Sequence, residues 1–96
     1  MELFIFARFH AREGQETAVE AALRDEVRAS REEPGCLAHD AFRSTGDPHL
    51  FCIHSRWTDE AAFEAHAELP HTVLFLKRVQ PLIDQPLDVT RARPVG

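Results

Sequence analysis

The sequence of 96 residues contains no long apolar run, and this shortage excludes one class of protein. A membrane-spanning helix needs roughly 18 or more consecutive apolar residues, and no stretch approaches that length. The apolar start is interrupted at Arg8, and no small-residue cleavage pattern follows it, as a signal peptide would require. We therefore expect a soluble, cytoplasmic protein without a membrane partner.

Basic residues are also few. The 11 Lys and Arg residues against 16 Asp and Glu residues give a formal net charge of -5, which opposes a phosphate backbone. None of the glycines belongs to a phosphate-cradling loop, which argues against a nucleotide cofactor. We expect no nucleic-acid partner, and the length predicts a single domain over residues 1–96.

The two cysteines could form one disulfide, so their placement matters. Extended runs lie on either side of the turn-forming segment STGDPH, which predicts a β-hairpin. In the register that pairs Arg43 with Leu50, Cys36 and Cys52 lie several residue pairs apart, beyond the reach of a disulfide. The sequence therefore predicts two free thiols and a reducing compartment.

Apolar periodicity predicts the remaining elements. Strands are expected at 3–9, 36–43, 50–57 and 86–92, and helices at 14–32, at 59–69 and from Pro70 to just before Pro81. With right-handed crossovers, this order gives a ferredoxin-like α+β fold, βαββαβ, whose helices cover one face of a four-stranded antiparallel sheet. In the helix that begins at Pro70, we expect Val73, Leu76 and Val79 to face inward.

The first strand carries apolar residues on both faces. Leu3, Ile5 and Phe9 share one face, and Phe4 and Phe6 share the other. The helices can cover only one side, and an open face with Phe and Ile would be a large exposed apolar patch. The pattern therefore predicts a homodimer that presses two such faces together.

Three motifs carry a resemblance to a known family: PGC at the start of the second strand, RWTDEAAFEAH, and PHTVLFLKRVQPLID. Over about residues 2–90, the sequence resembles the antibiotic biosynthesis monooxygenase family of dimeric α/β barrels. The resemblance implies a dimer built by facing sheets and a pocket between sheet and helices. It also implies that relatives oxygenate quinols or polyketide aromatics without metal or flavin, degrade haem, or act on small signalling molecules.

The match of individual residues to this family is partial. Trp57 matches a tryptophan that lines the pocket in several members, and His66 and His71 match histidines that recur in the group. The polyketide-oxidising branch has an asparagine and a tyrosine where this chain has Ile53 and Phe63. The chain contains no asparagine and no tyrosine, so those partners are missing.

A resident metal or haem is not expected. His39 and His54 face each other in the predicted hairpin register, but two imidazoles without a third ligand form a weak metal site. Lys77 stands near the position where haem-degrading relatives place an axial histidine. The sequence therefore predicts no cofactor.

His66 and His71 are the candidate catalytic residues. A histidine takes up a proton near neutral pH, and His66 lies on the inward helical stripe beside Phe63. His71 lies in a first helical turn, where the helix dipole favours the neutral imidazole. The structural alternatives are that His66 binds a backbone carbonyl and closes its helix, and that His71 caps a helix or contacts solvent.

The first hypothesis is a cofactor-independent monooxygenase that oxidises a small phenolic or quinol-like molecule with O2. Its substrate pocket is expected to contain Trp57, Phe63, Ile53 and His54. The alternatives are a non-catalytic ligand-binding or regulatory dimer of the same fold, and an isomerase or degrading enzyme for a small hydroxy-carbonyl compound.

Overall fold

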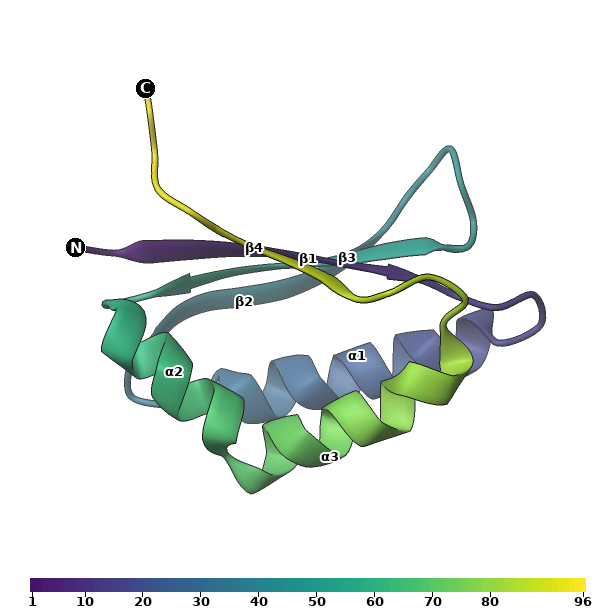
Figure 1. The fold of residues 1–96 in the computed structure, drawn as a ribbon, viewed down its shortest axis with the longest axis horizontal. Coiled ribbons are helices and arrows are strands. Elements are labelled where there is room, and N and C mark those ends of the chain that lie inside the picture. Colours follow the sequence, from purple (N-terminus) through teal and green to yellow (C-terminus); the bar gives the residue numbers. More distant parts are fainter.

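The computed structural model describes residues 1–96 and confirms the ferredoxin-like α+β fold. The strands are β1 (Leu3–His10), β2 (Cys36–Arg43), β3 (Leu50–Trp57) and β4 (Asp88–Ala92), and the helices are α1 (Glu16–Ser30), α2 (Glu60–Glu68) and α3 (Pro70–Val79), followed by a 3-10 turn at Gln80–Leu82. The strands form one antiparallel sheet in the order β2-β3-β1-β4. All three helices lie on the same side of it (Figure 1). None of these helices is long and apolar enough to cross a membrane.

Helix α1 buries a continuous stripe against the sheet. Its buried residues are Val19, Ala22, Leu23, Glu26, Val27 and Ser30, which recur at the three- and four-residue spacing of one helical face. Five of these six positions are apolar or small, and the sixth is a carboxylate. The stripe therefore places one ionisable group, Glu26, in the layer between helix and sheet.

The predicted hairpin is present, but its register differs from the expectation. Cys36 faces Trp57 as predicted, whereas Arg43 faces Phe51 instead of Leu50. The cause is a bulge at Leu37, which adds one residue to β2 and shifts every later pair. Both cysteines are free thiols, as the sequence predicts.

The shifted register separates two histidines that were expected to face each other. His39 pairs with Ser55 on the helix-covered face of the sheet, whereas His54 pairs with Asp40 on the open face. A shift of one residue moves a side chain to the opposite face, because side chains alternate along a strand. The expected His39–His54 pair is therefore wrong, and the two imidazoles lie on opposite sides of the sheet.

The core lies between the sheet and the helices, and the opposite face of the sheet is open (Figure 1). In α3 the buried residues are Thr72, Phe75 and Val79. Of the three positions predicted to face inward, only Val79 is buried: Val73 is 39% exposed, which makes that prediction wrong, and Leu76 lines a cavity but is 38% exposed. Leu69, between α2 and α3, has an extended backbone that breaks the helix and sets the rotation of α3. This rotation could not be derived from spacing alone.

Candidate functional site

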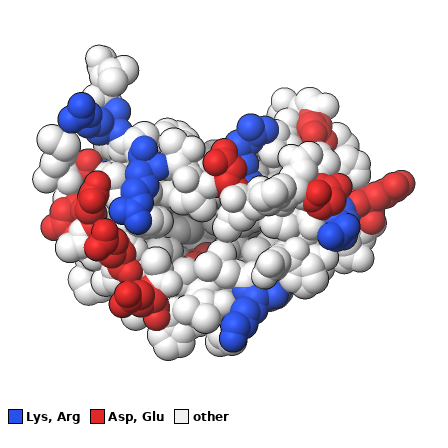
Figure 2. All heavy atoms as spheres, in the orientation of Figure 1, with Lys and Arg blue, Asp and Glu red and all other residues white.

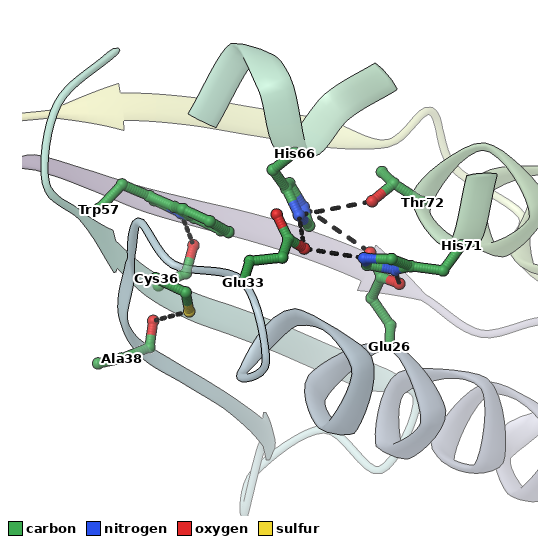
Figure 3. Close-up of polar contacts among 9 residues, drawn as sticks. Glu26, Glu33, Cys36, Ala38, Trp57, His66, His71 and Thr72 are labelled. Atoms are coloured by element: carbon green, nitrogen blue, oxygen red, sulfur yellow. Dashed lines mark hydrogen bonds and ion pairs between the residues drawn. The ribbon is translucent and has the colours of Figure 1, made fainter. Parts of the chain in front are cut away.

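Two histidines and two glutamates meet at the junction of the helices, and we call them the His–Glu cluster. Glu26 comes from α1, Glu33 from the turn after α1, His66 from α2 and His71 from α3 (Figure 3). Glu33 Oε2 lies 2.8 Å from both His66 Nδ1 and His71 Nε2, and Glu26 Oε1 lies 2.7 Å from His71 Nδ1. The two carboxylates thus connect α1 and the turn after it to helices that lie 33 to 45 residues further along the chain.

The backbone around Glu33 explains how this residue reaches the cluster. Gly35 lies so close to α2 that a Cβ at this position would overlap Ala62 Cβ, so only glycine allows the approach. The Gly35 carbonyl accepts a hydrogen bond of 3.0 Å from the Thr58 amide. The PGC segment therefore holds the turn, with Glu33, against the helix that carries His66.

The two ends of the α2–α3 pair are also fixed locally. Asp59 is the N-cap of α2, because its carboxylate accepts a hydrogen bond of 2.8 Å from the Ala62 amide. Pro70 occupies the first turn of α3, where its missing N–H leaves no unpaired donor. As a result, His71 lies one residue into α3 and points back toward Glu26 and Glu33 (Figure 3).

Burial changes the protonation of the cluster. Glu26 is only 4% exposed, and this burial raises the pKa of its carboxyl group although His71 and His66 oppose the change. Burial by itself would lower the pKa of His71, but hydrogen bonds with Glu26 and Glu33 outweigh it, so this pKa is raised. The carboxylates thus outweigh the helix dipole, which was expected to favour neutral His71. Because the pKa values of Glu26 and His71 are both raised, this pair holds its proton more strongly than the isolated groups would.

A cavity of about 200 Å³ lies beside the cluster, between the sheet and the α2–α3 pair. Its walls are largely apolar and include Ile5, Ala7, Phe9 and Ile53 from the sheet and Phe63 and Phe75 from the helices. Glu26 and His66 supply ionisable groups to this wall. Figure 2 shows the molecule hollowed near its middle, with charged side chains of both signs around the rim. Such a space suits a small, mostly apolar ligand.

The structure brings together most of the residues singled out in the sequence. Ile53 and Phe63 line the cavity with His66. Trp57 is completely buried behind His66, with ring centroids 4.5 Å apart, and its Nε1 donates a hydrogen bond of 3.0 Å to Ser55 Oγ. His71 belongs to the cluster but does not line the cavity, and His54 lies on the open face.

Three ionisable residues of the site were not predicted as site residues from the sequence. Glu26 could have been found, because it falls on the helical spacing of an otherwise apolar stripe. Glu33 directly precedes the PGC segment, but its contact with two histidines depends on the close approach of Gly35 to α2. His39 lines the cavity only because the bulge in β2 turns it to the covered face.

The cluster also contains the donor atoms of a possible metal site. One ligand atom each from Glu33, His66 and His71 lie within 4.8 Å of one another. Carboxylate and imidazole are suitable ligands for zinc and similar divalent ions. The same atoms are paired through hydrogen bonds, so a bound ion would have to replace the protons that hold the cluster together.

Comparison with known proteins gives a consistent set of relatives. Residues 3–78 match the antibiotic biosynthesis monooxygenase family. The Bacillus subtilis protein YcnE is 37% identical over 65 residues, which are 68% of each chain. The Mycobacterium tuberculosis protein Rv0793 is 28% identical over 91 residues, 95% of this chain and 89% of its own. Its solved structure aligns with a TM-score of 0.94 over 100% of this chain and 97% of that one. PA3566 from Pseudomonas aeruginosa aligns with a TM-score of 0.90 at 32% identity, covering 99% and 95% of the two chains.

Proposed function

Because this chain belongs to the antibiotic biosynthesis monooxygenase family, we propose that it is a cofactor-independent monooxygenase that oxidises a small phenolic or quinol-like molecule with O2. The provisional names of YcnE and Rv0793 also contain the word monooxygenase. The observation that carries the proposal is the apolar cavity of about 200 Å³ with His66 in its wall. A dry cavity beside a base is what such a reaction needs from the protein.

His66 is the base in this proposal. Its Nδ1 is hydrogen-bonded to Glu33, whereas Nε2 makes no hydrogen bond and lies 3.7 Å from Glu26 Oε2. When Nδ1 donates its hydrogen to the Glu33 carboxylate, Nε2 holds a free lone pair that can accept a phenolic proton. His71, which shares Glu33 and Glu26 with this ring, balances the charge of the cluster.

The reaction then proceeds from the deprotonated substrate. The phenolate transfers one electron to O2, and the resulting phenoxyl radical and superoxide combine at a ring carbon to form a hydroperoxide after His66 returns its proton. Cleavage of the O–O bond, with loss of the hydrogen on that carbon, releases water and leaves a quinone. One phenol and one O2 give one quinone and one water, so the substrate supplies all the electrons. The apolar walls exclude solvent from the anion.

Oxygen uptake tests the proposal. Electron-rich phenols and quinols are supplied singly, and O2 consumption is compared with the autoxidation blank, with the quinone product identified by mass spectrometry. We expect uptake by the native protein and its loss in His66→Ala. His49→Ala is the matched control, since His49 lies in the turn before β3 and does not line the cavity. No uptake with any substrate, or unchanged uptake in His66→Ala, contradicts the proposal.

The same experiment separates the alternative functions. A ligand that raises the melting temperature but is recovered unchanged indicates a binding or regulatory protein. A hydroxy-carbonyl compound that is rearranged without O2 consumption indicates an isomerase. The absence of asparagine and tyrosine favours these alternatives, because the oxygenase branch resembled by the sequence uses both residues.

We also propose that the protein forms a homodimer through facing sheets. On the open face, Phe6 and Phe42 are 48% and 56% exposed, and Phe4 lies on the same face. Burial of these rings against a second copy removes apolar surface from water. Light scattering after size exclusion should give twice the chain mass of 10.9 kDa, and Phe6→Glu should give the mass of a single chain.

A further inference from the structure

His39 is a buried imidazole without a hydrogen bond. Its side chain lines the cavity, the residue is 3% exposed, and Nδ1 is buried with no partner. Buried polar groups in proteins are almost always hydrogen-bonded, so an unpartnered one needs an explanation. An additional ligand atom in the cavity would provide the missing partner.

The surroundings of His39 hold its ring in place and keep it neutral. Its backbone carbonyl accepts a hydrogen bond of 2.9 Å from Arg31 Nε, and Trp57 lies edge-on to the ring at 6.2 Å. Burial, and then the positive charge that His66 and Arg31 can carry, lower the pKa of His39 to about 4, whereas Asp40 opposes the shift. At neutral pH the ring therefore offers one N–H donor and one lone-pair acceptor.

We propose that His39 is the polar subsite of the cavity and binds the hydroxyl or carbonyl oxygen of a ligand with a single aromatic ring. The size supports this class, since an apolar cavity of about 150 Å³ holds benzene and this one measures about 200 Å³. The inference rests on the proposed function in one respect: it takes this ligand to be the phenol that the enzyme oxidises.

His39 lies close enough to His66 for both rings to contact the same oxygen atom of a ligand. The ring centroids of His39 and His66 lie 6.0 Å apart. One oxygen atom with hydrogen bonds of about 2.8 Å to each ring spans such a separation. His39 would therefore hold the phenolic oxygen where His66 can remove its proton. In this arrangement His39 fixes which oxygen of the ligand reacts.

Anaerobic binding of phenol and toluene tests the subsite. The two ligands have nearly the same size and differ by a hydroxyl in place of a methyl group. Trp57 is the single tryptophan, is fully buried and lies next to His39, so its fluorescence reports on the cavity. We expect His39→Leu to weaken phenol binding about tenfold and to leave toluene binding unchanged or tighter. His39→Gln should retain part of the preference, and Ile53→Leu, an apolar change in the same wall, should retain all of it.

Stability provides the second measurement. A histidine with a structural role would be paired, so His39→Leu would then lower the melting temperature. Because no group pairs with this ring, we expect an unchanged or higher melting temperature. Three results overturn the proposal. The first is a lower melting temperature of His39→Leu with its preference for phenol intact, and the second is an equal loss of affinity for phenol and toluene in this variant. The third is that the native protein binds neither ligand. Absence of O2 uptake with an intact phenol preference contradicts the monooxygenase but leaves the subsite standing.

Discussion

The molecule contains two groups of histidines and carboxylates, one inside and one at the surface. In the His–Glu cluster, the side chains of Glu26, His66 and Glu33 are 3%, 8% and 12% exposed, and that of His71, at the edge of the cluster, is 28% exposed. At the far end of β1, an outer cluster consists of His10, Asp47 and Asp84, with His10 Nδ1 2.6 Å from Asp84 Oδ1 and Nε2 3.4 Å from Asp47 Oδ2. These three side chains are 24%, 44% and 37% exposed. The residue types and distances are similar, but the carboxylates are largely buried in the inner cluster and far more exposed in the outer one.

Burial gives the two clusters different protonation. In the outer cluster, a hydrogen bond with Asp84 raises the pKa of His10, and the hydrogen bond from the His49 backbone amide lowers the pKa of Asp47, so each group is driven toward its charged form. In the inner cluster, burial raises the pKa of Glu26 and opposes its ionisation. The outer cluster is therefore an ordinary set of surface ion pairs, and the inner one holds a proton beside a cavity.

The largest difference is expected in activity. Glu33→Gln removes the carboxylate that orients His66, so we expect O2 uptake to fall by about 10²- to 10⁴-fold, as when a general base loses its positioning partner. Asp84→Asn removes the corresponding carboxylate of the outer cluster and should change the rate less than about twofold.

Glu33 acts through His66, so the pH profile provides an independent readout. Loss of the carboxylate should also shift the pH at which the remaining rate of Glu33→Gln reaches half its maximum. Equal losses in Glu33→Gln and Asp84→Asn would mean that burial does not distinguish the clusters. Glu33→Asp keeps the carboxylate on a shorter side chain, so its rate of O2 uptake should lie between those of Glu33→Gln and Asp84→Asn.

Stability should show the next largest difference. Glu26→Ala removes a buried carboxylate and leaves His71 Nδ1 without its hydrogen-bond partner, although His71 Nε2 keeps its contact with Glu33, so we expect a loss of stability of about 1–3 kcal/mol. Asp84→Ala breaks an exposed pair and should cost a small fraction of this amount. Urea unfolding at neutral pH measures both. A loss in Glu26→Ala no greater than that in Asp84→Ala would show that the inner pair is as well solvated as the outer one.

Some structural features that place the inner cluster were predictable from the sequence. The α1 stripe, the hairpin and the placement of His66 beside Phe63 follow from spacing, because helical periodicity and turn residues are local properties. The face occupied by His39 was not predictable, since it depends on a bulge at Leu37 that no local pattern marks. The link between Glu33 and two histidines depends on three segments meeting, which spacing along the chain does not reveal.

The pH dependence of stability should distinguish the clusters by a smaller margin. The folded-state pKa of His71 is raised, so its stabilising contribution is complete below the unfolded value of 6.5 and is lost as the pH rises through the folded value. The melting temperature should therefore decline as the pH rises above 6.5. His71→Gln should remove most of this decline, because the Glu26 and Glu33 carboxylates that pair with His71 are largely buried. His10→Gln should remove little, because solvent screens the exposed Asp84 carboxylate that pairs with His10. If the melting temperature of His71→Gln declined with pH as steeply as that of the native protein, the decline would come from other ionisable groups.

The smallest effect is expected from metal removal. Glu33, His66 and His71 are the residues whose ligand atoms lie close enough to hold an ion, and the outer cluster has no such group. Each of these three side chains is hydrogen-bonded within the inner cluster, which satisfies its charge without a cation. Dialysis against EDTA should therefore change neither O2 uptake nor the melting temperature. A loss of uptake that added Zn²⁺ or Mn²⁺ restores in the native protein, but not in His71→Ala, would instead make the inner cluster a metal centre, because buried imidazole and carboxylate ligands bind such ions when their protons are displaced.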